Sequence, residues 1–156
     1  MGIRKPSIHQ HFQTKVELVV VLTQRYTHRI NEQLLAIEAQ HASAIERLRA
    51  YAEIFGQTFA QDRRLCMCGM LGAEADSLPD EIRAEVQRFF HLNRTWLGRV
   101  IADGQAAGQL RRGQTAANLA ALWLSAMEGS LLMGRGAVDA PSPAMIAGAL
   151  IDAWRP

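Results

Sequence analysis

The sequence predicts an all-α protein. Apolar residues recur every three or four positions along most of the chain, which is the period of a helix with one buried face. The interruptions carry helix-capping residues, and no stretch of useful length alternates apolar and polar residues as a half-buried strand would. A chain of 156 residues is long enough for one domain with a real hydrophobic core, plus a small appendage at most.

Two pairs of polar residues mark where the first two long helices begin. Thr14 with Glu17, and Ser43 with Glu46, have the spacing of capping boxes. Each start is followed by an apolar stripe at helical spacing. The stripes are Leu18, Leu22, Tyr26, Ile30, Leu34 and Ile37 in the first helix, and Ile45, Leu48, Ala52, Phe55 and Phe59 in the second.

The remaining sequence predicts four more segments. Residues 65–76 favour a short helix that two glycines weaken. Pro79 is typical of the first turn of a helix, and the long helix that follows stops near residues 104–108. Residues 114–134 are apolar on more than one face, so we expect that helix to be buried on two sides. The last helix, 143–154, is rich in Ala and Gly, which permits close approach of another helix.

The first 17 residues carry a local basic charge and the features of a DNA-reading helix. A short polar helix is predicted from about Lys5 to His11, just before the capped helix at Lys15. In helix-turn-helix proteins the second helix lies in the major groove and its first residues meet base edges. The candidate DNA-binding residues are Arg4, Lys5, Ser7, His9, Gln10, His11 and Lys15, which can donate to phosphates or bases.

This segment resembles the end of the DNA-binding domain of the tetracycline-repressor (TetR) family of bacterial transcription regulators. The resemblance rests on the pattern Gly2, Ile3, Ser7, Ile8, His11, Phe12, Thr14, Lys15 and Leu18, with His9 where many members have tyrosine. It implies a TetR-like helical bundle, with residues 1–15 as the remnant of a helix-turn-helix domain and residues 16–156 as a ligand-binding and dimerisation domain.

The resemblance also implies a function. The protein would be a homodimer that binds palindromic operator DNA, most often as a repressor, and releases it when a small-molecule effector enters the helical body. The helices 114–134 and 143–154 of both subunits would form a four-helix interface, which a charge such as Ala147→Glu would disrupt. The alternative is a helical dimer that binds a small molecule or a partner and has no role at DNA.

One part of the family's DNA-binding domain has no counterpart in the sequence. The first helix and the first member of the helix-turn-helix pair would precede Gly2. Ile3, Ile8 and Phe12 would then lack packing partners. We therefore expect this chain alone to bind operator DNA poorly, because the missing helices would support the reading helix.

The large apolar residues of the body are candidates for the core and, in part, for an effector pocket. Apolar pockets between helices are the usual binding sites in bundles. The tentative ligand-binding residues are Phe55, Phe59, Cys66, Met67, Met70, Phe89, Trp96, Trp123 and Met127.

Two features of the body each allow two interpretations. Cys66 and Cys68 point apart on a helix, so we do not expect them to pair with each other. One interpretation is that they are thiols that sense redox state or electrophiles, with Arg63 or Arg64 nearby. The other is that they are small buried packing residues. Glu128 is the one acid in the apolar run 119–133. If buried it needs a partner, such as a polar ligand group or a dimer contact; otherwise it lies at an exposed edge. The family's common acid–glycine pair, which Glu128 and Gly129 resemble, implies a structural role.

The sequence gives no sign of catalysis, a metal site or a cofactor. The histidines are scattered, no nucleophile stands at legible spacing from a base, and residues 104–108 lack the ending of a phosphate loop. We therefore expect no enzyme activity, no bound metal and no cofactor. No signal peptide and no run of about 18 apolar residues is present, so we expect a cytoplasmic protein without a membrane partner.

Overall fold

The computed structural model describes residues 12–156, and this part of the chain is entirely helical apart from turns and loops. The helices are α2 (Lys15–Gln40), α3 (Ala44–Ala60), α4 (Met67–Ala73), α5 (Asp80–Ala106), α6 (Ala116–Gly136) and α7 (Pro143–Trp154), with a 3₁₀ turn, η1 (Ala75–Ser77), before α5. No strand occurs within these residues. The prediction of an all-α fold is confirmed.

Side-chain caps fix the helix starts where the sequence predicts them. The Thr14 hydroxyl accepts a hydrogen bond from the Glu17 N–H at 3.1 Å. Ser43 and Glu46 form a complete capping box, in which each side chain accepts from the other residue's backbone N–H. Two boundaries differ from expectation: Pro79 precedes α5 instead of lying in its first turn, and α4 ends at Ala73 because the chain then tightens into η1.

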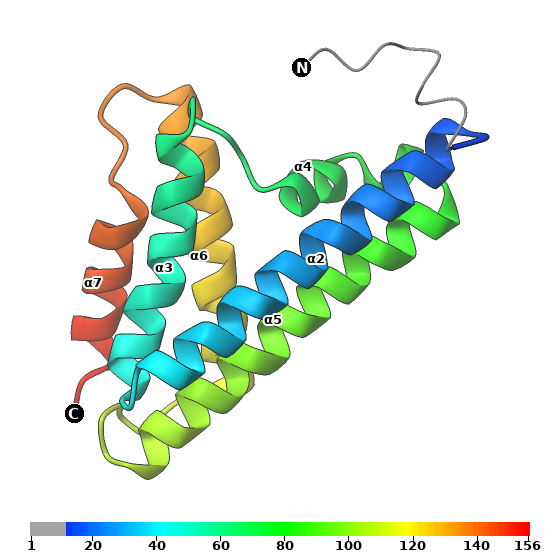
Figure 1. The fold of residues 1–156 in the computed structure, drawn as a ribbon. Coiled ribbons are helices and arrows are strands. Elements are labelled where there is room, and N and C mark those ends of the chain that lie inside the picture. The colour runs from blue at the N-terminus through cyan, green and yellow to red at the C-terminus, as the bar shows by residue number, and fades with distance from the viewer. Residues whose placement is uncertain (1–11) are drawn as a thin grey trace.

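The helices form two groups that α4 connects (Figure 1). The long helices α2 and α5 lie side by side and run in the same direction, as contacts near both ends show. The Gln24 side chain donates to Glu85 at 3.0 Å, and Arg99 pairs with Glu38 at 3.1 Å. The other group consists of α3, α6 and α7, with α5 packed against α6 and α3. The short α4 packs on α5 and α2.

The core lies where the two groups meet. Its largest fully buried side chains are Trp123, Tyr51, Phe89, Leu34, Leu48, Leu97, Ile101, Leu110, Met127, Leu131, Ile151 and Val100. The predicted stripe of α2 is buried only in its second half: Leu34 is buried, whereas Leu22 is 46% exposed. The first turns of α2 extend beyond α3 and α6, and among residues 12–156 their neighbouring helices are α5 and α4 (Figure 1).

The helix α6 is long and apolar enough to cross a membrane by length and composition, with a mean hydropathy of 1.2 over 18 residues. Here it is a core helix, because Trp123 and Met127 are fully buried against α5, α3 and α7. Ala147 of α7 is also buried, with 1% of its surface exposed. The expectation that Ala147 lies at a subunit interface is therefore wrong: α7 turns this residue toward α3 and α6.

Candidate ligand-binding site

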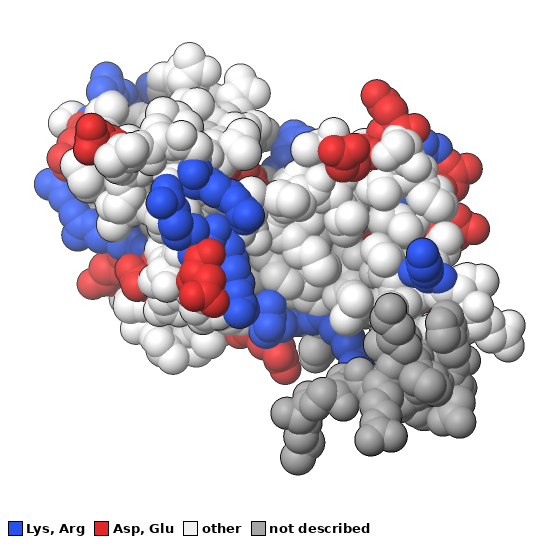
Figure 2. Space-filling view, turned by 90° about the horizontal axis from the view of Figure 1, so that it is seen from above, with Lys and Arg blue, Asp and Glu red and all other residues white. Residues whose placement is uncertain are grey.

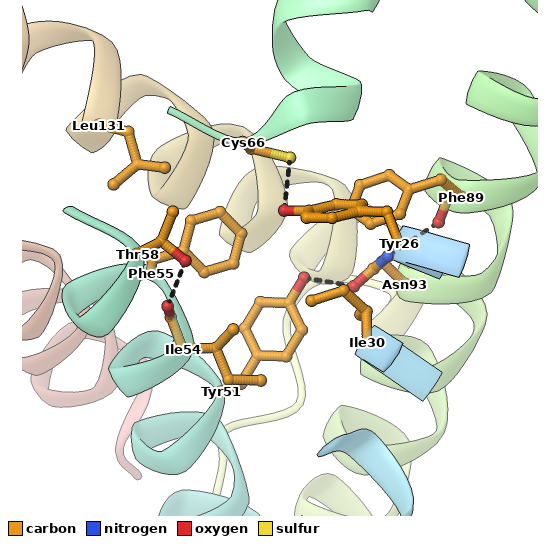
Figure 3. Close-up of a pocket in the computed structure, with 10 residues that line it drawn as sticks. All are labelled: Tyr26, Ile30, Tyr51, Ile54, Phe55, Thr58, Cys66, Phe89, Asn93 and Leu131. Atoms are coloured by element: carbon orange, nitrogen blue, oxygen red, sulfur yellow. Dashed lines mark hydrogen bonds between the residues drawn. The ribbon is translucent and has the colours of Figure 1, made fainter. Parts of the chain in front are cut away.

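A cluster of buried polar and aromatic side chains lies where α2, α3, α4 and α5 meet (Figure 3). The Tyr51 hydroxyl donates to the Asn93 carbonyl oxygen at 2.8 Å, and the Asn93 amide donates to the Phe89 carbonyl at 2.8 Å. The Tyr26 hydroxyl reaches across from α2 to the Cys66 sulfur at 3.6 Å. Side chains from α2, α3 and α5 and from the N-cap of α4 therefore converge on one interior point, which we call the central site.

Apolar side chains enclose the central site. Ile30, Ile54, Phe55 and Leu131 line it together with the aromatic rings. The Thr58 hydroxyl also borders it but donates to the Ile54 carbonyl, so it offers the interior no free proton. The free space between these side chains is about 10 Å³, which holds one water molecule at most. A ligand larger than water can enter only if these side chains move apart.

A wider groove lies immediately outside the central site. Its volume is about 450 Å³, and Tyr26, Ile30, Ile54 and Thr58 line both spaces. Arg29 and Arg64 give the groove a basic rim. Figure 2 shows Lys and Arg side chains beside the hollow between the two halves of this face. The Arg29 guanidinium lies 5.2 Å from the centre of the Tyr26 ring, and this ring is part of the wall that the open groove and the closed interior share.

The ionisable groups around the central site are all acids, and burial favours the neutral form of each. Desolvation raises the pKa of Tyr26 and of Tyr51 above the ordinary tyrosine value. Burial, and next the negative charge of Glu128, raise the pKa of Cys66 to about 12. The pKa of Cys68 and that of Glu128 are raised chiefly by the same desolvation.

Glu128 reaches this region from α6. Its Oε1 is buried and has no hydrogen-bond partner within the described residues. A Cβ atom at Gly69 of α4 would lie 2.5 Å from Glu128 Oε2. The carboxyl group thus occupies the volume that any side chain at position 69 would need, so Gly69 lets α4 pack over Glu128. Of the two interpretations of Glu128, the structure favours the buried one.

The tentative ligand-binding residues fall into two groups. Phe55, Cys66 and Phe89 line the central site, Met67 lines the outer groove, and Met70 lines a third pocket beside Glu128. The others pack behind these spaces and line none of the three: they are Phe59, Trp96, Trp123 and Met127.

Aromatic contacts explain why those residues serve the packing. Trp96 stacks on Tyr51 with ring centres 5.6 Å apart, and Trp123 meets Trp154 at the same distance. Phe59 packs against Gly134, where a Cβ atom would lie 2.9 Å from its ring. These residues hold the site's walls in place without bordering its free space.

Sequence reasoning missed Tyr51 and Asn93, and it treated Tyr26 only as part of an apolar stripe. A signal for Asn93 was available, because this residue falls in the buried phase of α5 between Phe89 and Trp96. A polar residue in that position has to find a hydrogen-bond partner inside the protein. Which partner it finds depends on how α3 packs against α5.

The two cysteines are buried, with 3% of Cys66 and none of Cys68 exposed. Arg63 lies over the Phe59 ring and donates to the Gly134 carbonyl, and Arg64 lies beside Gln61 and Asp62. Neither arginine lowers the pKa of a thiol. The arrangement favours packing residues over reactive thiols.

The candidate DNA-binding residues are described only in part. Arg4, Lys5, Ser7, His9, Gln10 and His11 lie outside the described residues. Lys15 is exposed in the first turn of α2, directly after the capping Thr14. Within residues 12–156, no three His, Cys, Asp or Glu side chains come together as a metal site would require.

Comparison with known proteins gives a consistent family. A family model described as tetracyclin repressor-like, C-terminal domain, matches residues 44–144. A TetR-family transcriptional regulator from Agrobacterium tumefaciens is 29% identical with a TM-score of 0.93, covering 99% of this chain and 82% of that one. A TetR regulator from Legionella pneumophila is 26% identical with a TM-score of 0.87, covering 98% and 81%.

A third solved structure shares the fold at lower identity. AibR, in complex with isovaleryl coenzyme A and operator DNA, is 18% identical with a TM-score of 0.70, covering 99% of this chain and 82% of that one. No curated protein matches the chain significantly.

Proposed function

Because the chain belongs to the TetR family of transcriptional regulators, we propose that it is a ligand-responsive repressor in the cytoplasm, which acts as a homodimer and leaves its operator when a small molecule enters the central site. Members of this family are in general transcription factors and not enzymes. The observation that carries the proposal is the closed central site, which adjoins an open groove and shares with it a wall formed by Tyr26, Ile30, Ile54 and Thr58.

The position of Tyr26 supports a coupling between ligand and DNA. A ligand that passes from the groove to the interior has to part the four residues that line both spaces, and two of these, Tyr26 and Ile30, belong to α2. This helix begins at Lys15, so it directly follows the segment that carries the candidate DNA-binding residues. A shift of α2 would therefore move the reading helix, and the ligand's differential affinity for the two positions sets the size of the effect.

The solved structure of AibR supports two parts of this proposal at the level of the fold, ligand binding and operator binding. That protein is described with isovaleryl coenzyme A and operator DNA bound together. The fold can therefore hold an organic ligand and contact an operator in one complex. For the present chain, Arg4, Lys5, Ser7, His9, Gln10, His11 and Lys15 are the proposed DNA contacts.

The outer surface of α6 and α7 supports a homodimer. Leu122, Leu132 and Met133 of α6 and Met145 of α7 are all at least half exposed. Exposed apolar side chains on two helices that pack against each other are typical of a protein interface. A Cβ atom at Gly129 or Gly148 would meet nothing within 4 Å, which leaves room for a second subunit's helices to approach closely.

The experiment that tests DNA binding compares two proteins by fluorescence anisotropy on the DNA upstream of the gene. One is the chain as given, and the other is extended upstream in frame. We expect tight binding with a steep salt dependence from the extended chain and weak binding from the chain as given, because phosphate contacts release counterions. Failure of both to bind any upstream DNA would favour a ligand-binding dimer with no role at DNA.

A further inference from the structure

A third space, which we call the Glu128 pocket, lies between α4 and α6. Its volume is about 190 Å³. Leu65, Met70, Leu131 and Leu132 form its apolar walls, and Glu128 is the one charged residue that borders it. The pocket is smaller than the 300–1,000 Å³ typical of sites for drug-sized molecules. It suits a small ligand with an apolar body and one polar end.

The carboxyl group of Glu128 has no basic partner among residues 12–156: the Cys66 thiol forms a hydrogen bond with it that lowers its pKa less than burial raises it, and Oε1 has no partner at all. Glu128 Oε1 is the only carboxylate oxygen among the buried, unpartnered side-chain atoms of residues 12–156. The other buried side-chain atoms without a hydrogen-bond partner in this part of the chain are a threonine hydroxyl and two indole nitrogens. Leaving an ionised carboxylate buried and unpaired is costly, whereas a charge-assisted hydrogen bond to it is among the stronger polar contacts in proteins.

No basic side chain of the described residues supplies that partner. Four groups lie close enough to Glu128 for its charge to raise their pKa. They are Tyr26 of α2, Tyr51 of α3, and Cys66 and Cys68 at α4. All four are acids. Arg94 of α5 lines a neighbouring groove together with Glu128. None of the ion pairs within residues 12–156 joins the two.

We propose that the Glu128 pocket binds a small organic cation. The ammonium or amidinium group pairs with the Glu128 carboxylate, which turns its unpartnered oxygen toward the ligand, and the apolar body packs against Leu65, Met70, Leu131 and Leu132. An anion of the same shape is repelled by Glu128, and a neutral apolar molecule leaves Oε1 without a partner. Gly69 serves the same site, since any side chain there would displace the carboxyl group.

The pocket adjoins the central site, because Cys66 and Leu131 line both. The inference therefore names the chemical class of the effector, and its consequence at DNA rests on the proposed function. Binding of the cation is measured without DNA, and operator binding is measured without the cation. The two proposals can therefore fail separately.

The test uses three six-carbon probes that differ in charge: hexylammonium, 1-hexanol and hexanoate. Affinity is measured by calorimetry, and Tm by differential scanning fluorimetry, for the unaltered chain, Glu128→Gln and the control Glu74→Gln, which replaces an exposed glutamate at the end of α4. We expect hexylammonium to bind the unaltered chain and Glu74→Gln at least about tenfold more tightly than hexanol, with no binding of hexanoate.

Glu128→Gln is expected to abolish that preference for the cation, because glutamine keeps the shape and removes the charge. A second variant, Met70→Trp, narrows the pocket from a residue that is 52% exposed, so folding is not at risk. It should weaken hexylammonium binding. Hexylammonium affinity of the unaltered chain should also rise with pH as Glu128 loses its proton, since burial raises the pKa of this carboxyl.

Three results would overturn the inference. They are no response of the unaltered chain to hexylammonium, equal affinity for all three probes, and a preference for the cation that persists in Glu128→Gln. A fourth outcome would assign the carboxylate to another occupant: if Glu128→Gln weakens the homodimer and hexylammonium does not bind, a basic residue of the second subunit fills the pocket.

Discussion

The hydrogen-bonded pair of Tyr51 and Asn93 sets the polarity of the interior. Both residues expose only 1% of their surface. The two side chains form a hydrogen bond with each other, and the Asn93 amide forms a second one with the backbone. Glu128 differs from this pair, because one of its oxygens has no partner. A satisfied buried pair stabilises a unique packing, whereas an unsatisfied carboxylate destabilises the fold that buries it.

The pH dependence of stability should reveal the burial of Glu128. Desolvation raises the pKa of this carboxyl in the folded protein above its ordinary value. The folded state therefore holds the proton more tightly, and the corresponding stability is present at acid pH and lost as pH rises through the folded pKa. Glu128→Gln has no proton to lose. We expect its free energy of unfolding, relative to the unaltered chain, to increase from pH 4.5 to pH 8.

Urea unfolding at a series of pH values measures this difference. Glu74→Gln is the matched control and should follow the unaltered chain at every pH. A constant difference between Glu128→Gln and the unaltered chain across the series would contradict the burial of an unpaired carboxyl at this position.

The reactivity of the two thiols depends on how deeply each one is buried. Because burial raises the pKa of Cys66 to about 12, almost none of this residue is thiolate at pH 8. We expect iodoacetamide to modify Cys66 and Cys68 in the native protein at least about a hundredfold more slowly than in the unfolded chain. Mass spectrometry of timed samples measures both rates. Rapid modification of the native protein would restore the thiol-sensor interpretation.

For whole helices, local sequence signals were sufficient to predict where a helix begins, but not which of its faces is buried. The Thr14 and Ser43 caps act within a few residues, so the sequence predicted the starts of α2 and α3 correctly. The burial of Ala147 depends on how α7 is rotated against α3, and a sequence rich in Ala and Gly has no strong polar face to reveal that rotation. The expected interface residue on α7 was wrong for this reason.

The proposed dimer interface can be tested at a residue that avoids the core. Leu122 of α6 is 50% exposed, so Leu122→Glu should leave the monomer folded. In a symmetric dimer each subunit would bring this charge to the interface. We expect the dimer Kd to rise about tenfold to a hundredfold, as measured by sedimentation at several concentrations.

The control is Leu35→Glu on α2, which replaces a leucine of similar exposure, 56%, outside α6 and α7. It should sediment as the unaltered chain does. Equal dimerisation of Leu122→Glu and Leu35→Glu would refute an interface on this face of α6.

At the scale of the whole molecule, the site is a product of packing between distant segments. Tyr51 and Asn93 are 42 positions apart, and Tyr26 and Cys66 are 40 apart. Gly69 meets Glu128 only because α4 lies on the bundle beside α6. Periodicity predicted the helices that carry these residues and several that line the site, such as Phe55 and Phe89. It contained no information on which polar side chains meet, or on the closed state of the space between them.

The closed central site also explains how ligand and DNA could compete. With about 10 Å³ of free space, ligand entry requires a conformation other than the present one. Tyr26 would move with its ligand, and α2 carries that movement toward the N-terminal segment. Such linkage requires only two conformations of the protein, with α2 in different positions, that differ in their affinity for the ligand and for the operator.

The most direct test of the account is operator release measured by fluorescence anisotropy. The chain extended upstream in frame is bound to its operator and titrated with hexylammonium, or with any compound that raises its Tm. We expect anisotropy to fall to the value of free DNA at saturation, and Met70→Trp, which narrows the Glu128 pocket, to require a higher hexylammonium concentration. An operator that stays fully bound at saturating ligand would contradict ligand-induced release.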